Sequence, residues 1–364
     1  LIWPTAFVGR AGGLMSVLMA SLLAGCSHLG PTATDPSADD PAPKLTHLYD
    51  YQLIDSQRQT PLTLPGLVEQ LAHADVIFVG EYHGNHASHL LQAQLQAALY
   101  AQHPHQVLSL EQFERDDQNT LERYLEGQIG EKTLIKATDA WPNYAGSYRP
   151  MVHFAKRHLL PVIAANAPGA IVRCVGRHGP DYLKRLPDTQ TAWVAQTPFY
   201  NPKAYQAKFA QLMQRGSHKA ASASASETAP DLNARQRRSY QAQLLRDNTM
   251  AESILKAKRQ YPKAQVLHLN GAFHSDQKLG TVAALAHRAP ELTLAVISPV
   301  RIDPERAPQW LAQAQTTTLA QGDFLYLIQP QPTEYVQAKK RRAALRQQFE
   351  QADQKTCLPP QRSD

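Results

Sequence analysis

Residues 76–84 read Val76-Ile77-Phe78-Val79-Gly80-Glu81-Tyr82-His83-Gly84, and residues 266–274 read Val266-Leu267-His268-Leu269-Asn270-Gly271-Ala272-Phe273-His274. Each segment is an apolar run of strand length that ends in Gly-x-x-His. Continuous apolar runs are typical of strands buried on both faces, as in parallel sheets. Polar groups at the carboxyl ends of such strands converge on the crevice where open α/β sheets bind ligands. We therefore expect the two Gly-x-x-His copies to face one site.

Strand and helix patterns alternate around these two segments. Val107 to Glu111, Leu160 to Ala165 and Leu292 to Ile297 have strand character, and Phe324 to Ile328 is expected to be an edge strand. His86 to Gln102 carries apolar residues at helical spacing. The sequence therefore predicts an α/β fold with a mostly parallel sheet flanked by helices.

The chain is expected to have four parts. They are a lipoprotein signal peptide at 1–25, a flexible tether at 26–45, an α/β domain at 46–330, and a charged C-terminal helix and tail at 331–364. Within the α/β domain, the helical patterns of about 115–155 and 170–250 predict a smaller helical lobe. The low-complexity Ala-Ser stretch at 217–230 is expected to be a loop.

The amino-terminal region has the features of an export signal. Arg10 precedes the apolar run from Ala11 to Ala24, which is too short for a membrane-spanning helix and suits the apolar core of a signal peptide. The run ends in Leu23-Ala24-Gly25-Cys26, which resembles the lipobox of bacterial lipoproteins. This resemblance implies cleavage before Cys26 and attachment of lipid such as palmitate to its thiol. Ser27, a residue other than Asp after the cysteine, implies sorting to the outer membrane. An ordinary signal peptide with an incidental cysteine is the alternative.

Cys174 and Cys357 are the other two cysteines. An exported protein would meet an oxidising compartment, so the two could pair, but their spacing leaves both the paired and the free state open. The formal net charge is +6, and the basic residues are dispersed apart from residues 339–342, which suit a solvated helix. We therefore expect no nucleic-acid partner.

Four polar residues end the predicted strands and could carry chemistry. Glu81 and His83 follow the first segment, His274 follows the second, and Glu111 ends the neighbouring strand. Two histidines and a carboxylate could hold a divalent metal with an open position. The same residues could equally form a hydrogen-bonded polar floor, so both interpretations stay open.

A second group of candidates is aromatic. Trp141, Tyr144 and Tyr148 stand close together in the sequence, and a tyrosine phenolate is a known axial ligand of ferric haem. Plain packing between the lobes is the alternative for Trp141 and Tyr144. Arg246, on a long predicted helix, could pair with a carboxylate of the protein or of a ligand.

Six short segments, in this order, suggest a family. They are Phe-Val-Gly-Glu-Tyr-His (78–83), Leu-Glu-Gln-Phe (110–113), Trp141 with Tyr148-Arg149-Pro150, Ile163-Ala164-Ala165-Asn166, Leu245-Arg246-Asp247-Asn248-Thr249-Met250-Ala251 and Asn270-Gly271-Ala272-Phe273-His274. Together they resemble the ChaN family of haem-binding, iron-regulated lipoproteins, over roughly residues 47–300. The lipobox agrees with this resemblance independently.

The resemblance implies a function in haem and iron acquisition. It implies haem held at the surface between two subunits, with Tyr148 or Tyr144 on the iron, and work beside a TonB-dependent outer-membrane receptor. In such a haem-binding protein, His83 could hydrogen-bond to the ligand or occupy the other axial side of the iron, Trp141 and nearby helix faces would supply apolar contact, and Arg246 could meet a propionate.

An enzyme is the competing interpretation. ChaN proteins are similar to a wider group with Tiki-type metalloproteases and erythromycin-esterase-like hydrolases. By that similarity Glu81, His83, Glu111 and His274 would line the site of a metal-dependent peptidase or esterase. We favour a binding protein over an enzyme.

Overall fold

The computed structural model describes residues 45–215, 232–310, 314, 316–354 and 356–357. The predicted signal peptide, Cys26 and the Ala-Ser loop lie outside these residues, as does all of the predicted tether except Leu45.

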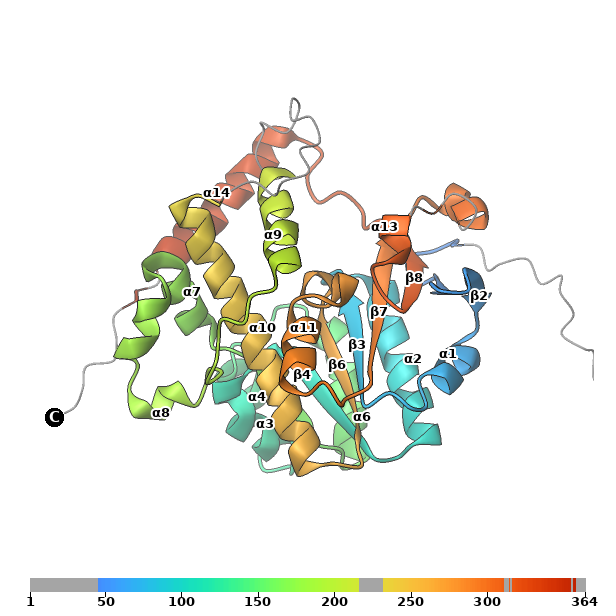
Figure 1. Cartoon of the computed structure of the whole chain (residues 1–364), viewed down its shortest axis with the longest axis horizontal. Helices are drawn as coiled ribbons and strands as arrows, with labels where there is room; N and C mark the ends of the chain where they lie inside the picture. Colours follow the sequence, from blue (N-terminus) through green and yellow to red (C-terminus); the bar gives the residue numbers. More distant parts are fainter. Residues whose placement is uncertain (1–44, 216–231, 311–313, 315, 355, 358–364) are drawn as a thin grey trace, which may run out of the picture. The chain divides into compact units, whose positions relative to one another are not determined.

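One sheet forms the centre of the molecule (Figure 1). Its strands are β1 (Tyr51–Asp55), β2 (Thr60–Leu62), β3 (Val76–Glu81), β4 (Gln106–Glu114), β5 (Val162–Asn166), β6 (Gln265–Gly271), β7 (Leu294–Arg301) and β8 (Phe324–Ile328). Their order across the sheet is β2-β1-β8-β7-β3-β6-β4-β5. Neighbours from β8 to β5 are parallel, whereas β1 pairs antiparallel with β2 and β8.

The prediction that Phe324 to Ile328 forms an edge strand is wrong. This segment is β8, which lies between β1 and β7, and Tyr51 to Asp55 pairs with it along its whole length. The error arises because the β1–β2 hairpin, which the sequence patterns did not reveal, adds two strands beyond β8.

Helices connect the strands and cover the sheet. They are α1 (Leu64–Gln70), α2 (His86–Gln102), α3 (Gln118–Leu125), α4 (Glu131–Ala137), α5 (Tyr144–Ser147), α6 (Arg149–Arg157), α7 (Gly169–His178), α8 (Asp188–Thr191), α9 (Lys203–Arg215), α10 (Ala234–Gln260), α11 (Thr281–Arg288), α13 (Thr316–Leu319) and α14 (Ala338–Gln354). None of the helices in the described part of the chain is long and apolar enough to cross a membrane.

The two faces of the sheet carry separate apolar cores. Because successive side chains of a strand point to opposite faces, Ile77 and Val79 of β3 join the cluster that contains residues of α1, α2 and α6. Val76 and Phe78 join the cluster that contains residues of α10 and α11. The result is a three-layer arrangement with the sheet in the middle (Figure 1), which confirms the predicted α/β fold class.

The regions predicted to build a helical lobe are helical in the structure. Residues 115–155 contain α3, α4, α5 and most of α6, and residues 170–250 contain most of α7, all of α8 and α9, and the first part of α10. Val172 and Val175 of α7 pack with Leu245 of α10 in a cluster of their own. This cluster is separate from the two cores on the sheet, so these helices have an apolar contact of their own.

Cys174 of α7 and Cys357, which follows α14, form a disulfide across 183 residues of sequence. We expect reduction to lower the free energy of unfolding by about 2–4 kcal/mol, because the bond restricts the unfolded chain. Urea unfolding with and without dithiothreitol, followed by circular dichroism, measures this loss. A double Cys174→Ser, Cys357→Ser variant should be insensitive to the reductant. Identical unfolding midpoints for the oxidised and reduced wild-type protein would contradict the prediction.

Candidate functional site

The two Gly-x-x-His segments lie on neighbouring strands. β3 and β6 are parallel and hydrogen-bonded, with Glu81 opposite Gly271 and Gly80 opposite Asn270. The two motif copies are therefore offset by one residue, since Gly80 does not face Gly271. β4, which carries Glu111, is the other neighbour of β6. The strand ends thus bring Glu81, His83, Glu111 and His274 to the same edge of the sheet.

Glu81 is a buried carboxylate with several donors. Its Oε1 accepts hydrogen bonds from the hydroxyl of Tyr148 at 2.5 Å and from Nδ1 of His83 at 2.8 Å. Its Oε2 accepts one from Nε2 of Gln92 at 2.7 Å. Buried charges persist in proteins when they are paired and hydrogen-bonded. Glu81 therefore holds His83 and Tyr148 in fixed orientations.

His83 is the accessible member of the set, with 47% of its side chain exposed. Its ring packs edge-on against the half-buried Trp141, with 4.9 Å between ring centroids. The Nε2–Cε1 edge lies over Gly271, where a Cβ would come within 2.9 Å of the ring. Partial burial opposes the charged imidazolium, but the bond to Glu81 and the nearby charge of Glu111 outweigh it and raise the pKa of His83.

Three buried residues form a second network beside the first. Nδ1 of His274 lies 2.7 Å from Oδ1 of Asp247, and its Nε2 lies 3.3 Å from Oε1 of Glu111. The other oxygen of Glu111 accepts a hydrogen bond from the backbone N–H of Gly271 at 2.6 Å. Burial disfavours charge on His274, but the two carboxylates outweigh it and raise its pKa to about 10. Burial likewise opposes the charge of Glu111, yet the charge of His274 and these bonds hold the pKa of Glu111 far below its usual range.

Asp247 is a member of this network that the sequence analysis missed. Its carboxylate also accepts hydrogen bonds from the hydroxyls of Tyr205 at 2.7 Å and Thr281 at 2.9 Å. Asp247 directly follows Arg246 in one of the six family-like segments. Its place in that segment was the sequence signal that could have identified it as a site residue. Tyr205 and Thr281 lie on α9 and α11, in segments that carried no motif.

The four predicted residues lie in two hydrogen-bonded networks, and the polar-floor and metal-site interpretations both stay predictions. Within the described residues, no group of three His, Cys, Asp or Glu side chains is arranged to hold a metal ion. Both ring nitrogens of His274 are already bonded to carboxylates. A metal ligand must offer a free lone pair, so His274 is not available as a ligand in this arrangement.

The two candidate tyrosines are both buried. Tyr148 is fully enclosed and donates to Glu81, and burial, followed by the charge of Glu81, raises the pKa of its phenol far above the ordinary value. Tyr144 is also buried, its hydroxyl has no partner among the described residues, and burial raises its pKa as well. Both phenols are therefore neutral here, and their assignment as iron ligands stays a prediction.

Arg246 is half-buried on α10, and its charge acts on Glu114 and Arg173. Adjacent residues on a helix point in different directions, and on α10 it is Asp247 that faces His274. The predicted contact of Arg246 with a propionate is not tested by this placement.

Comparisons with known proteins agree with this fold. Residues 67–285 match the model of a family described as haem-binding uptake, Tiki superfamily, ChaN. No curated protein matches the chain.

Three solved structures are similar to the chain. One shows cofacial haem binding to ChaN of Campylobacter jejuni; it is 16% identical, has a TM-score of 0.57, and the match covers 77% of this chain and 98% of that one. A mutant of the erythromycin esterase EreC in its open conformation is 11% identical with a TM-score of 0.44, over 79% and 99% of the two chains. A succinoglycan biosynthesis protein is 11% identical with a TM-score of 0.44, over 76% and 95%. The first of these supports the fold, and the other two are too distant to carry an argument.

Proposed function

We propose that this chain, which belongs to the ChaN family of haem-binding uptake proteins in the Tiki superfamily, is a lipid-anchored protein that captures haem at the outer membrane. One observation carries the location of the haem site. It is the half-exposed imidazole of His83, which Glu81 orients and Trp141 flanks. An aromatic wall beside an accessible imidazole suits a flat apolar ligand that contains a metal.

The residues present fit haem as the cargo. Metal-binding imidazoles almost always donate their second ring N–H to a carboxylate or carbonyl, which fixes the ring and makes it a better ligand. The bond from Nδ1 of His83 to Glu81 supplies this support. His83 would therefore hold the iron, and Trp141 would contact the porphyrin.

Tyr148 and Tyr144 remain the alternative iron ligands. For Tyr148 to bind iron, its hydroxyl would have to leave Glu81 and become accessible, and its phenol would have to lose a proton that burial strongly retains. For Tyr144 the same burial applies, without a hydrogen bond to break among the described residues. In the conformation described, His83 needs no such change.

The proposed location of the protein at the outer membrane rests on the sequence and on one structural feature. The lipobox-like segment ending at Cys26 would supply the lipid anchor, and the tether that follows would hold the domain off the membrane. The disulfide between Cys174 and Cys357 supports export, because such bonds persist in oxidising compartments. Transfer of haem to or from a TonB-dependent receptor is part of the proposal.

We further propose that haem joins two copies of the chain. A haem on the exposed side of His83 would keep one face open, and a second copy could cover it. Burial of that face would add apolar contact on both sides of the ligand. The protein from Campylobacter jejuni is described as binding haem cofacially, which supports this arrangement.

A hemin titration of the domain from residue 45 onward tests the proposal. We expect a saturable Soret band in absorbance, and a shift toward the dimer in size-exclusion chromatography as hemin is added. A spectrum identical to that of free hemin at every ratio would refute haem binding. A Soret band without any change of elution volume would refute the haem-mediated dimer alone.

A hydrolase is the second candidate function, and the paired carboxylate–imidazole contacts favour it. Glu81 orients His83 at an accessible edge, an arrangement suited to a general base that removes a proton at Nε2. A metal-dependent version would need a different arrangement of His274, because both of its nitrogens are occupied.

Ester and peptide substrates assayed with and without EDTA separate these possibilities. Hydrolysis that His83→Ala abolishes would support the hydrolase function. Loss of this hydrolysis on adding EDTA would support its metal-dependent form. Absence of hydrolysis above the rate of the His83→Ala variant would count against both forms.

A further inference from the structure

A cation lies at the carboxyl end of β7, the strand next to β3. Arg301 is the last residue of β7 and is exposed. Among the described residues no carboxylate pairs with its guanidinium, which instead stacks on the ring of Tyr82, with 3.6 Å between Cζ and the ring centroid. The hydroxyl of Tyr82 donates to the backbone carbonyl of Pro299 at 3.4 Å, so the ring beneath the guanidinium is itself held in place.

Arg301 and His83 lie at the carboxyl ends of neighbouring strands. β3 and β7 are parallel and pair directly, with Val79 opposite Ile297. β7 ends at Arg301, and His83 comes two residues after the end of β3. Tyr82, the residue before His83, fills the space next to Arg301. The guanidinium is therefore fixed at the same strand edge as the accessible imidazole.

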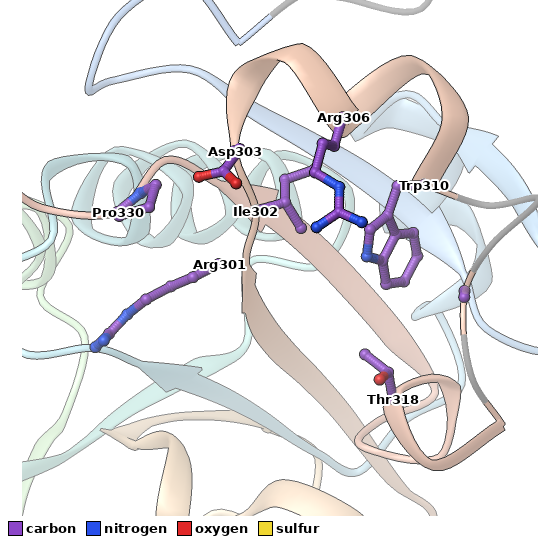
Figure 2. Close-up of a pocket in the computed structure, with 8 residues that line it drawn as sticks. Arg301, Ile302, Asp303, Arg306, Trp310, Thr318 and Pro330 are labelled. Carbon is purple, nitrogen blue, oxygen red and sulfur yellow. The ribbon is translucent and has the colours of Figure 1, made fainter.

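Arg301 also lines a cavity of about 310 Å³ together with Arg306 and Trp310. Figure 2 shows the side chain of Arg301 extending away from Arg306 and Trp310, which lie close to one another. The two arginines of the cavity thus face different surroundings. The guanidinium of Arg301 stacks on the ring of Tyr82. Arg306 is also exposed, but among the described residues it makes no such stacking contact.

A guanidinium in this position would bind an anionic group of the ligand. A guanidinium offers a planar fork of donors that matches a carboxylate, and stacking on an aromatic ring orients the fork before the ligand arrives. Haem carries two propionate carboxylates on an apolar ring. We propose that Arg301, oriented by Tyr82, binds a propionate of the haem at His83 and makes the site selective for porphyrins that carry free carboxylates. This inference rests on the proposed haem binding.

Hemin and its dimethyl ester, which lacks free carboxylates, provide the test. Titrations would compare the wild-type protein with Arg301→Gln and with the matched control Arg306→Gln. We expect the wild-type protein to prefer hemin over the ester by roughly 10- to 100-fold, the range for one charge-assisted hydrogen bond. In Arg301→Gln this preference should disappear while the affinity for the ester stays the same. Arg306→Gln should keep the preference.

The outcomes distinguish a failure of the Arg301 inference from a failure of haem binding itself. If the wild-type protein binds hemin and Arg301→Gln keeps the full preference, Arg301 is not the propionate ligand, and haem binding stands. An equal loss of hemin and ester affinity in Arg301→Gln would indicate a damaged surface and would also overturn the inference. If the wild-type protein binds neither compound, the proposed function fails and the inference falls with it. Circular dichroism would confirm that both variants are folded.

Discussion

Replacing His274 with alanine is expected to lower the free energy of unfolding by roughly 3–5 kcal/mol, the usual cost of breaking a buried ion pair by removing one partner. The imidazole lies between the buried carboxylates of Glu111 and Asp247, at 3.3 and 2.7 Å. Its removal leaves two negative charges in the interior with only neutral donors, such as the N–H of Gly271 and the hydroxyl of Tyr205. Urea unfolding at pH 6, followed by circular dichroism, measures the loss.

His83→Ala is the matched control for this prediction. Both residues are histidines at the same strand edge, but nearly half of the His83 side chain is exposed. Without it, Glu81 still accepts hydrogen bonds from Tyr148 and Gln92. We therefore expect a loss of about 1 kcal/mol for His83→Ala. Similar losses for the two variants would show that the His274 network does not stabilise the fold in this way.

The same contacts make stability depend on pH. The two carboxylates raise the pKa of His274 from 6.5 to about 10 against the effect of burial. A group whose pKa is raised in the folded state stabilises the protein fully below its unfolded pKa. That stabilisation is then lost as the pH rises toward the folded pKa. The advantage of the wild-type protein over His274→Gln should therefore be largest near pH 6 and shrink by several kcal/mol, roughly, toward pH 10. A constant difference between the two proteins across this range would contradict the raised pKa.

The centre of the fold was predictable because its strands are buried on both faces. β3 and β6 read as unbroken apolar runs, and an apolar run of strand length that ends in polar residues is typical of an inner strand of a parallel sheet. β1 and β2 were not predictable in the same way. β2 is short and largely exposed, and its pairing with β1 depends on a turn rather than on an apolar pattern. Because this hairpin was not recognised in the sequence, the β8 segment was interpreted as an edge strand.

The site was predictable only where strands build it. Glu81 ends β3, Glu111 lies near the carboxyl end of β4, and His83 and His274 come shortly after β3 and β6. The rule for parallel sheets brings such residues together. Asp247 and Tyr205 come from the helices α10 and α9. Helical periodicity says which face of a helix is apolar, but it does not say which strand end that face meets. The burial of Tyr148 was hidden for the same reason, because its partner Glu81 is far away in the sequence.

The arrangement shows how one edge of the sheet can combine a stable interior with an accessible ligand. His274 and its two carboxylates are enclosed, and the positive imidazolium offsets one of the two negative charges. Glu81 is enclosed as well, but its hydrogen bond fixes the orientation of His83, which reaches the surface. Stability and binding therefore depend on different histidines, and the two can be separated by mutation.

Replacing His83 with alanine is expected to weaken hemin binding by more than about 100-fold. Loss of a group that only supports a metal ligand commonly costs roughly 10- to 100-fold in affinity, so loss of the ligand itself should cost more. The bond to Glu81 also raises the pKa of His83, and the protonated ring cannot bind iron. Hemin affinity of the wild-type protein should therefore fall as the pH is lowered, and absorbance titrations at several pH values measure both effects.

Tyr148→Phe is the informative control, because it removes the competing ligand and leaves the ring in place. If His83 binds the iron, this variant should keep its hemin affinity and its Soret maximum, and should lose only the stability that comes from the hydrogen bond to Glu81. If Tyr148 binds the iron, the variant should lose the charge-transfer absorbance of a phenolate ligand, whereas His83→Ala should keep it. The second result would mean that haem binding breaks the contact between Tyr148 and Glu81, so the structure described here would be the haem-free state of a protein that opens to receive its ligand.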